Sequence, residues 1–219
     1  MIAIFLAAAA TVAQPVISGP TAIDAERAFA RDAQRIGQWA AFRKYAARDA
    51  VMFTPQVVWA RDFLKDRKEP RRAISWSPAA SVMSCDGTVA VNAGPYSVPG
   101  ATGAGSHGRF TTVWLKGSKG WRWIYDGGEP TAKPVPAGPV PLVSRAACTG
   151  HPTGAPIASA PTLSSSATAA LPNDYGRGES ADRTLGWDWK VEKGGMRTLR
   201  VYQWTGRRYA QRVYQRVAP

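Results

Sequence analysis

Two helix-like segments precede a long series of strand-like segments in this chain of 219 residues, and that order limits its fold most strongly. Thr21 can cap the first helix, with Asp24 three residues on, and apolar residues then recur at helical spacing up to Gly37. Residues 38–47 keep the same spacing. Helices followed by antiparallel strands predict an α+β domain in which two N-terminal helices pack in a curved antiparallel sheet.

Turn residues divide the strand-like part of the chain. The pair Asp86-Gly87 lies between two short apolar runs and predicts a hairpin, and residues 117–120 predict a second turn. Strands are expected at residues 50–54, 57–60, 73–77, 81–85, 88–92, 109–116 and 121–126, with a charged, solvated connector at 65–72.

Composition changes after the predicted α+β domain, which we place at residues 21–129. Residues 131–180 are rich in Pro, Ala and Ser and lack periodicity, so we expect a linker. Residues 181–219 regain strand character and predict a basic, three-stranded meander. Because three strands are barely stable alone, we expect the meander to pack against the main sheet.

The N-terminus predicts export. Residues 1–13 form an apolar run ending in small residues, as in a signal peptide, although no Lys or Arg precedes the run. The run is shorter than the ~20 residues that span a bilayer. We therefore expect a periplasmic or secreted protein without a membrane span after cleavage; the alternative is an apolar segment packed on the domain.

Export would place the chain's two cysteines, Cys85 and Cys148, in a compartment where a disulfide persists. They permit one intramolecular pairing, which would hold the Pro-rich segment to the domain. Two unrelated thiols are the alternative. The wide spacing fits neither a redox pair nor a zinc site.

The helical and strand motifs resemble the NTF2-like superfamily, in particular the small SnoaL-like and DUF4440-type domains. The resemblance covers about residues 21–129 and is carried by residues 25–32, 38–42, 45–55, 110–114 and 120–126. It implies a bent sheet wrapped round the helices, a pocket at one end of this cone, and often a homodimer. Such domains include isomerase-like and cyclase-like enzymes, dehydratases and non-catalytic binders. Relatives often carry His at the positions of Tyr125 or Gly127, and its absence here favours binding over catalysis.

Aromatic side chains are the candidate lining of that pocket. Alternation along the last two strands predicts that Phe110, Thr112 and Trp114 share one face, and that Trp121, Trp123 and Tyr125 share one face of the partner strand. The predicted ligand-binding set is Tyr45, Phe53, Trp59, Trp76, Phe110, Trp114, Trp123 and Tyr125. Ordinary core packing is the alternative for every member.

Three carboxylates are weak catalytic candidates: Asp126 at a strand end, and Asp49 and Asp32 at or near helix ends. In an apolar site such a group could serve as a general base. The two histidines, His107 and His151, lie in segments that predict no rigid scaffold. The sequence shows no clustered metal ligands and no cofactor motif, so none is predicted.

Cations and aromatics alternate in the C-terminal strands. The set expected to face an anionic partner is Arg200, Tyr202, Trp204, Arg212, Tyr214 and Arg216. A net charge of +13 agrees with such a partner, although export argues against nucleic acid. A solvated face is the alternative.

Three functions therefore stay open. The leading hypothesis is an exported domain that binds a small hydrophobic or aromatic ligand without catalysis. The second is an isomerase-, dehydratase- or cyclase-like enzyme that uses an aspartate in the cone. The third is an envelope module that binds an anionic polymer through its basic C-terminal strands.

Overall fold

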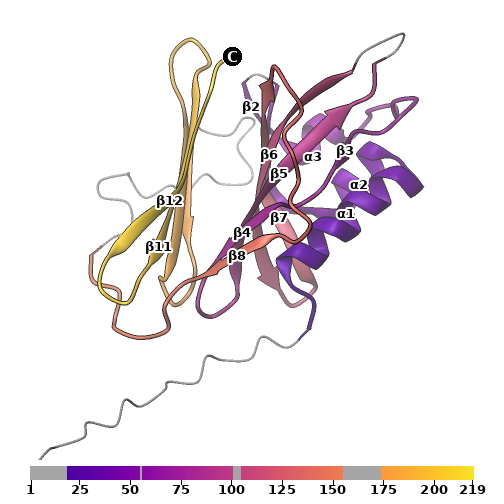
Figure 1. Cartoon of the computed structure of the whole chain (residues 1–219). Coiled ribbons are helices and arrows are strands. Elements are labelled where there is room, and N and C mark those ends of the chain that lie inside the picture. The colour runs from indigo at the N-terminus through magenta and orange to yellow at the C-terminus, as the bar shows by residue number, and fades with distance from the viewer. Residues whose placement is uncertain (1–18, 55, 101–104, 155–173) are drawn as a thin grey trace, which may run out of the picture.

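The chain folds into three layers: helices, a large curved sheet and a smaller sheet (Figure 1). The computed structural model describes residues 19–54, 56–100, 105–154 and 174–219. The predicted α+β class with a large curved sheet is confirmed. The proposed signal peptide, residues 1–13, lies outside the described residues.

The helices begin and end where local chemistry dictates. Helix α1, Ala22–Ile36, starts with a capping box in which Asp24 N–H donates to Thr21 Oγ1 at 3.2 Å and Thr21 N–H donates to Asp24 Oδ2 at 2.9 Å. It ends at Gly37, whose φ of 106° suits glycine. Helix α2 is Gln38–Tyr45, and the short α3 is Ala60–Leu64.

A residue of the charged connector caps α2. The Glu69 carboxylate accepts the backbone N–H groups of Trp39 at 2.8 Å and Ala40 at 2.9 Å. A carboxylate at a helix N-terminus satisfies free N–H groups and opposes the positive end of the helix dipole. The predicted solvated connector is confirmed, since residues 65–72 are all exposed, and Glu69 has this capping role in addition.

The main sheet has the order β2-β1-β7-β6-β5-β4-β8, and β3 pairs with β5. Its strands are mostly antiparallel, but β1 pairs with β7, and β4 with β8, in parallel. The strands are β1 Ala46–Phe53, β2 Val57–Trp59, β3 Ser75–Trp76, β4 Ala80–Met83, β5 Val89–Val98, β6 Ser106–Gly117, β7 Gly120–Thr131 and β8 Leu142–Arg145. The Asp86-Gly87 turn joins β4 to β5, with Gly87 at φ 68°.

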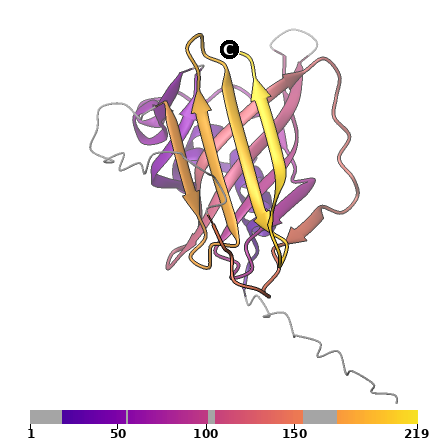
Figure 2. The same ribbon diagram turned by 90° about the vertical axis from the view of Figure 1, so that its left-hand side faces the viewer.

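The C-terminal sheet has four antiparallel strands in the order β12-β11-β10-β9 and covers the face of the main sheet opposite the helices (Figures 1 and 2). Its strands are β9 Tyr175–Glu179, β10 Leu185–Val191, β11 Arg197–Trp204 and β12 Tyr209–Val217. Two predictions need correction. The meander has four strands, and the segment 131–180 contributes both β8 and β9.

Each face of the main sheet has its own core. The helix-side core includes Phe29, Phe42, Trp114 and Trp123. The core between the sheets includes β-branched residues of the main sheet together with Trp187 and its neighbours on the inner face of β10 and β11. The C-terminal strands are thus an integral layer of the fold.

Two glycines of β9 make room for tryptophans of β10. Gly178 pairs with Trp187 and Gly176 with Trp189, and a Cβ at either glycine would lie within 2.8 Å of the indole opposite. We expect Gly178→Val to lower the free energy of unfolding by about 1–3 kcal/mol, because the Trp187 ring must leave its packed position. Urea unfolding would measure this loss. The control, Gly117→Val, alters an exposed glycine at the end of β6 that has open space around it and, like Gly178, no positive φ. Equal losses in the two variants would contradict the packing explanation.

The predicted disulfide between Cys85 and Cys148 is present. It lies where the two sheets meet: Cys85 N–H donates to the Thr184 hydroxyl at 2.8 Å, and Arg145 Nε donates to the Cys85 carbonyl at 3.1 Å. At the Cys148 end of the disulfide, the Trp204 indole N–H donates to the carbonyl of the next residue, Thr149, at 3.0 Å. The bond therefore joins the main sheet to the segment that covers the end of β11.

Candidate functional site

A cavity of about 280 Å³ lies between the helix layer and the main sheet. Its walls come from α2, the segment leading into β3, and strands β3, β5, β6 and β7. The lining residues are Phe42, Ile74, Trp76, Tyr96, Val98, Phe110, Asp126, Gly127 and Gly128. The cavity is mostly apolar, and Asp126 carries the one carboxyl group among these residues.

An irregularity in β7 decides which side chains face the cavity. Trp123 pairs with Trp114, but Tyr125 pairs with Val113, so Ile124 is an extra residue in β7. Side-chain alternation is reversed beyond it. The prediction that Tyr125 shares a face with Trp123 is wrong, and Asp126 takes the place on the cavity side.

The eight predicted ligand-binding residues therefore separate into three groups. Trp76 and Phe110 line the cavity. Tyr45, Trp114 and Trp123 are packed in the helix-side core, and Phe53, Trp59 and Tyr125 belong to the core between the sheets. Most of the aromatic set is thus core, as the alternative interpretation held.

Asp126 is the carboxylate that the fold places at the cavity. The Thr112 hydroxyl donates to its Oδ2 at 3.2 Å. Burial raises the pKa of Asp126 to about 6, while the Thr112 hydrogen bond and the charge of Arg197 act in the opposite direction. A carboxyl group that titrates near neutral pH can both accept and return a proton.

Glu26 is a second buried carboxyl group, which the sequence interpretation missed. It is fully buried on α1. Its oxygens accept the indole N–H groups of Trp76 at 2.8 Å and Trp114 at 2.6 Å, and the Asn92 amide at 3.3 Å. Burial raises the pKa of Glu26 to about 7, against these hydrogen bonds and with a further contribution from the charge of Asp126.

A signal for Glu26 is present in the sequence. Ala22, Glu26, Phe29 and Ala33 recur at helical spacing, and all four are buried. A charged residue on the apolar face of an amphipathic helix is rarely buried without partners. Glu26 does not line the cavity, but its hydrogen bond holds Trp76, which does.

The other two candidate carboxylates lie elsewhere. Asp49 is exposed on β1. Asp32 on α1 is bound to Lys44 at 2.6 Å, to Arg35 at 2.8 Å and to the Tyr45 hydroxyl at 3.1 Å. The hydrogen bond from Lys44, followed by that from Arg35, lowers the pKa of Asp32 to about 2. Asp32 therefore joins α1 to α2, and neither residue lines the cavity.

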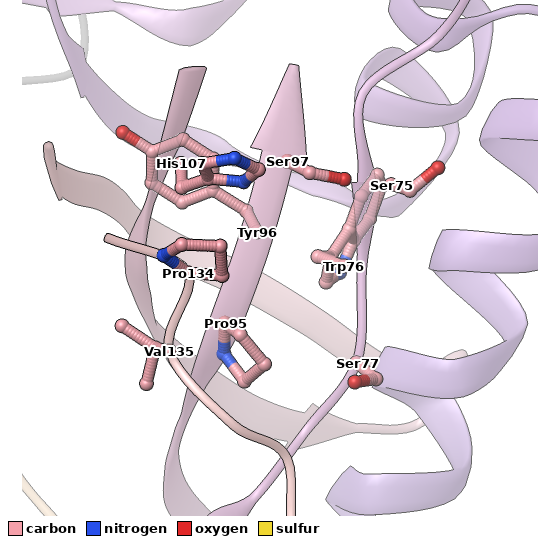
Figure 3. A pocket seen from close by; sticks show the side chains of 9 residues that line it. All are labelled: Ser75, Trp76, Ser77, Pro95, Tyr96, Ser97, His107, Pro134 and Val135. Atoms are coloured by element: carbon pink, nitrogen blue, oxygen red, sulfur yellow. The ribbon is translucent and has the colours of Figure 1, made fainter. Parts of the chain in front are cut away.

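A second hollow of about 400 Å³ is shown in Figure 3, and it shares Trp76 and Tyr96 with the wall of the first. Residues Pro134 and Val135, beyond β7, form its opposite side. His107 lines this hollow from β6, whereas the sequence predicted it in a loop. His151 is exposed beyond β8.

The predicted anionic-partner set is only partly available on the outer face of the C-terminal sheet. Arg200 Nε donates to Asp188 Oδ1 at 2.9 Å, so its charge is paired. Trp204 is buried under the segment after Cys148, and Arg212 donates to Gln203 at 3.0 Å. The remaining members are Tyr202, partly exposed, and Tyr214 and Arg216, both exposed. The prediction of one continuous cationic and aromatic face is therefore wrong for Trp204.

Comparisons with known proteins add little beyond the geometry. No protein-family model matches the chain, and no curated protein matches it. A solved structure assigned as a Ca/calmodulin-dependent kinase II association domain, from Exiguobacterium sibiricum 255-15, is 16% identical with a TM-score of 0.38. The match covers 52% of this chain and 98% of that one. A likeness of this size assigns neither family nor function. Within the described residues, no helix is long and apolar enough to cross a membrane.

Proposed function

We propose that this chain is an exported NTF2-like protein whose cavity binds a small, largely apolar ligand that makes one hydrogen bond to Asp126. The observation that carries the proposal is a single carboxyl group in a mostly apolar cavity of about 280 Å³. Such a combination gives affinity through apolar burial and orientation through the polar group. The SnoaL-like or DUF4440-type assignment rests on the sequence motifs alone.

The order of elements supports the NTF2-like part of the proposal. A helix pair at the N-terminus is followed by strands, and the long hairpins β5–β6 and β6–β7 bend round that pair. The cavity lies where α2 meets these three strands, at one end of the bent sheet. Periplasmic or secreted localisation rests on residues 1–13.

A ligand screen by thermal shift tests the binding function, with a variant that blocks the cavity. Val98 lines the cavity and is 39% exposed, so Val98→Trp should fill the mouth without disturbing the packed core. Val140→Trp places the same substitution on a residue that is 73% exposed and outside the cavity lining.

Small aromatic and alicyclic compounds that carry a hydroxyl or amide group are the probes. A ligand at 100 times its dissociation constant adds about 2.7 kcal/mol of stability, enough for a Tm rise of several degrees. We expect the wild type and Val140→Trp to respond and Val98→Trp to lose the response. A wild type that responds to none of the probes, or a Val98→Trp variant that responds equally, would contradict the proposal.

A second candidate function is proton transfer by Asp126, as in an isomerase-, dehydratase- or cyclase-like reaction. The observation that favours it is the position of Asp126 in the wall of a mostly apolar cavity, where burial raises its pKa to about 6. Above that pH the carboxylate can remove a proton from a bound ligand, and below it the neutral acid cannot.

The pH dependence of ligand binding reports on Asp126 whether or not a reaction follows. A ligand that donates a hydrogen bond should bind more weakly as the pH falls through about 6, because the carboxylate becomes protonated. In Asp126→Asn this dependence should vanish, and affinity should fall about tenfold, as for a lost hydrogen bond to a charged group. Calorimetric titration between pH 5 and pH 8 measures both quantities. Unchanged affinity in Asp126→Asn would place the ligand elsewhere.

A further inference from the structure

Arg197, at the start of β11, is a buried cation with no carboxylate partner among the described residues. Its side chain belongs to the C-terminal sheet but is only 7% exposed, and its Nε atom has no hydrogen-bond partner. None of the ion pairs between described residues includes it. Burial of an unpaired guanidinium is costly, so something in the fold compensates its charge.

Two groups compensate this charge: the Phe53 ring of β1 and the Gly128 carbonyl of β7. Arg197 Nη2 donates to the Gly128 carbonyl at 2.7 Å, and the guanidinium carbon lies 4.3 Å from the centroid of the Phe53 ring. The ring face and the carbonyl dipole each attract a cation. Gly128 lies two residues after Asp126 and, with Gly127, forms part of the cavity wall.

The part of the cavity wall that Arg197 contacts includes two glycines. Gly127 and Gly128 line the cavity, and the Gly128 carbonyl accepts a hydrogen bond from the guanidinium, while the Tyr125 side chain lies against Gly127. A charge in an interior of low dielectric acts over several ångströms. Burial raises the pKa of Asp126 on the cavity side and of Tyr125 between the sheets, and the charge of Arg197 opposes both of these rises.

We propose that Arg197 is the counter-charge of Asp126, so that the C-terminal sheet supplies a positioning residue for the carboxyl group of the cavity. The inference deepens the proposed function, on which the importance of Asp126 rests. It also gives the second sheet a role besides packing: a chain that lacks Arg197 keeps the cavity but holds Asp126 as a neutral acid over a wider pH range.

The other titratable groups near Arg197 are few. Tyr125 on β7 and Tyr96 on β5 have pKa values that burial raises, so they stay neutral at physiological pH. Glu129 on β7 accepts a hydrogen bond from Gln215 Nε2 at 3.2 Å. A test must therefore separate Asp126 from Glu129.

Carbon-13 NMR of the aspartate carboxyl groups in the full chain provides that test. Asp126→Asn identifies the Asp126 resonance. Arg197→Met removes the charge and keeps most of the volume, and its Asp126 midpoint should rise by about one pH unit, as expected for loss of one nearby charge. Arg197→Lys should restore most of the wild-type value. Arg200→Met, three residues along the strand and paired with Asp188 instead, should leave the midpoint unchanged.

A second measurement needs no change at Arg197. In the wild type, the nitrogen-15 shift of Arg197 Nε should follow the Asp126 titration with the same midpoint; this response should vanish in Asp126→Asn and persist in Glu129→Gln. A flat Arg197 shift, or an unchanged Asp126 midpoint in folded Arg197→Met, would overturn the proposal. Neither NMR measurement uses a ligand, so the test of Arg197 does not depend on the outcome of the ligand screen.

Discussion

Replacing Glu26 with Ala is expected to lower the free energy of unfolding at pH 5 by about 4 kcal/mol. The substitution leaves the indole N–H groups of Trp76 and Trp114 without their acceptor, and the Asn92 amide loses one of its two. Each buried donor without a partner costs about 1–3 kcal/mol, and the lost side-chain volume adds a cavity term. This is a large share of the stability of a typical domain.

Urea unfolding followed by tryptophan fluorescence and by circular dichroism measures this loss. Glu192→Ala is the matched control, because Glu192 is exposed in the turn between β10 and β11. The control should change stability by less than about 0.5 kcal/mol. A Glu26→Ala variant as stable as the control would mean that the indole groups do not depend on Glu26.

The same residue makes stability depend on pH. Its pKa rises from an ordinary value of 4.5 to about 7 on folding, so the folded chain keeps a proton that the unfolded chain releases between those values. Stability should therefore fall as the pH rises through this window, by about 3 kcal/mol in total. Asp126 acts in the same direction between 3.8 and about 6.

Asp32 acts in the opposite direction at low pH. Its pKa falls from 3.8 to about 2 on folding, so its contribution is present above 3.8 and is lost as the pH falls towards 2. We therefore expect maximal stability near pH 4–5. Glu26→Gln should remove most of the fall between pH 5 and pH 8, and a wild type equally stable at both values would contradict the raised pKa of Glu26.

Local chemistry made much of the fold predictable. The Thr21 capping box, the helix stop at Gly37 and the Asp86-Gly87 turn each depend on residues close in sequence. Helices α1 and α2 and the hairpins of the main sheet follow from these signals and from apolar periodicity. Such features need no knowledge of tertiary contacts.

The errors arise where tertiary packing decides. Nothing in the sequence of β7 marks Ile124 as an extra residue, because the aromatic alternation continues through Tyr125. Glycines that predict a linker at 175–179 are instead required by the indoles packed against them. Arg197 lies in a basic segment, and its burial follows only from the packing of one sheet on the other.

The packing of the two sheets also bears on the expected homodimer. The face of the main sheet opposite the helices is covered by the chain's own C-terminal sheet (Figure 2). A second copy could use that face only by displacing Trp187 and its neighbours from the core. A dimer, which stays a prediction, must therefore use another surface or a rearranged C-terminal sheet.

Removal of the disulfide is the other change with a large expected effect. Cys85 and Cys148 are 63 residues apart in sequence, and opening a loop of that length costs about 4 kcal/mol in the chain-entropy model. The loss of stability should be greater for the C-terminal sheet than for the main sheet. The disulfide fixes the segment that covers Trp204, and β8 of that same segment pairs with β4.

Urea unfolding of the double variant Cys85→Ala, Cys148→Ala measures the loss, and the wild type with a reducing agent should match it. The double variant itself should be indifferent to the reducing agent, which controls for effects on other groups. The Trp204 side chain should become solvent-exposed before the main sheet unfolds, because the segment after Cys148 that covers it is released first. If the wild type is equally stable with and without reducing agent, the disulfide adds nothing to the native fold, and the junction between the sheets is held by hydrogen bonds such as that from Cys85 N–H to Thr184 alone.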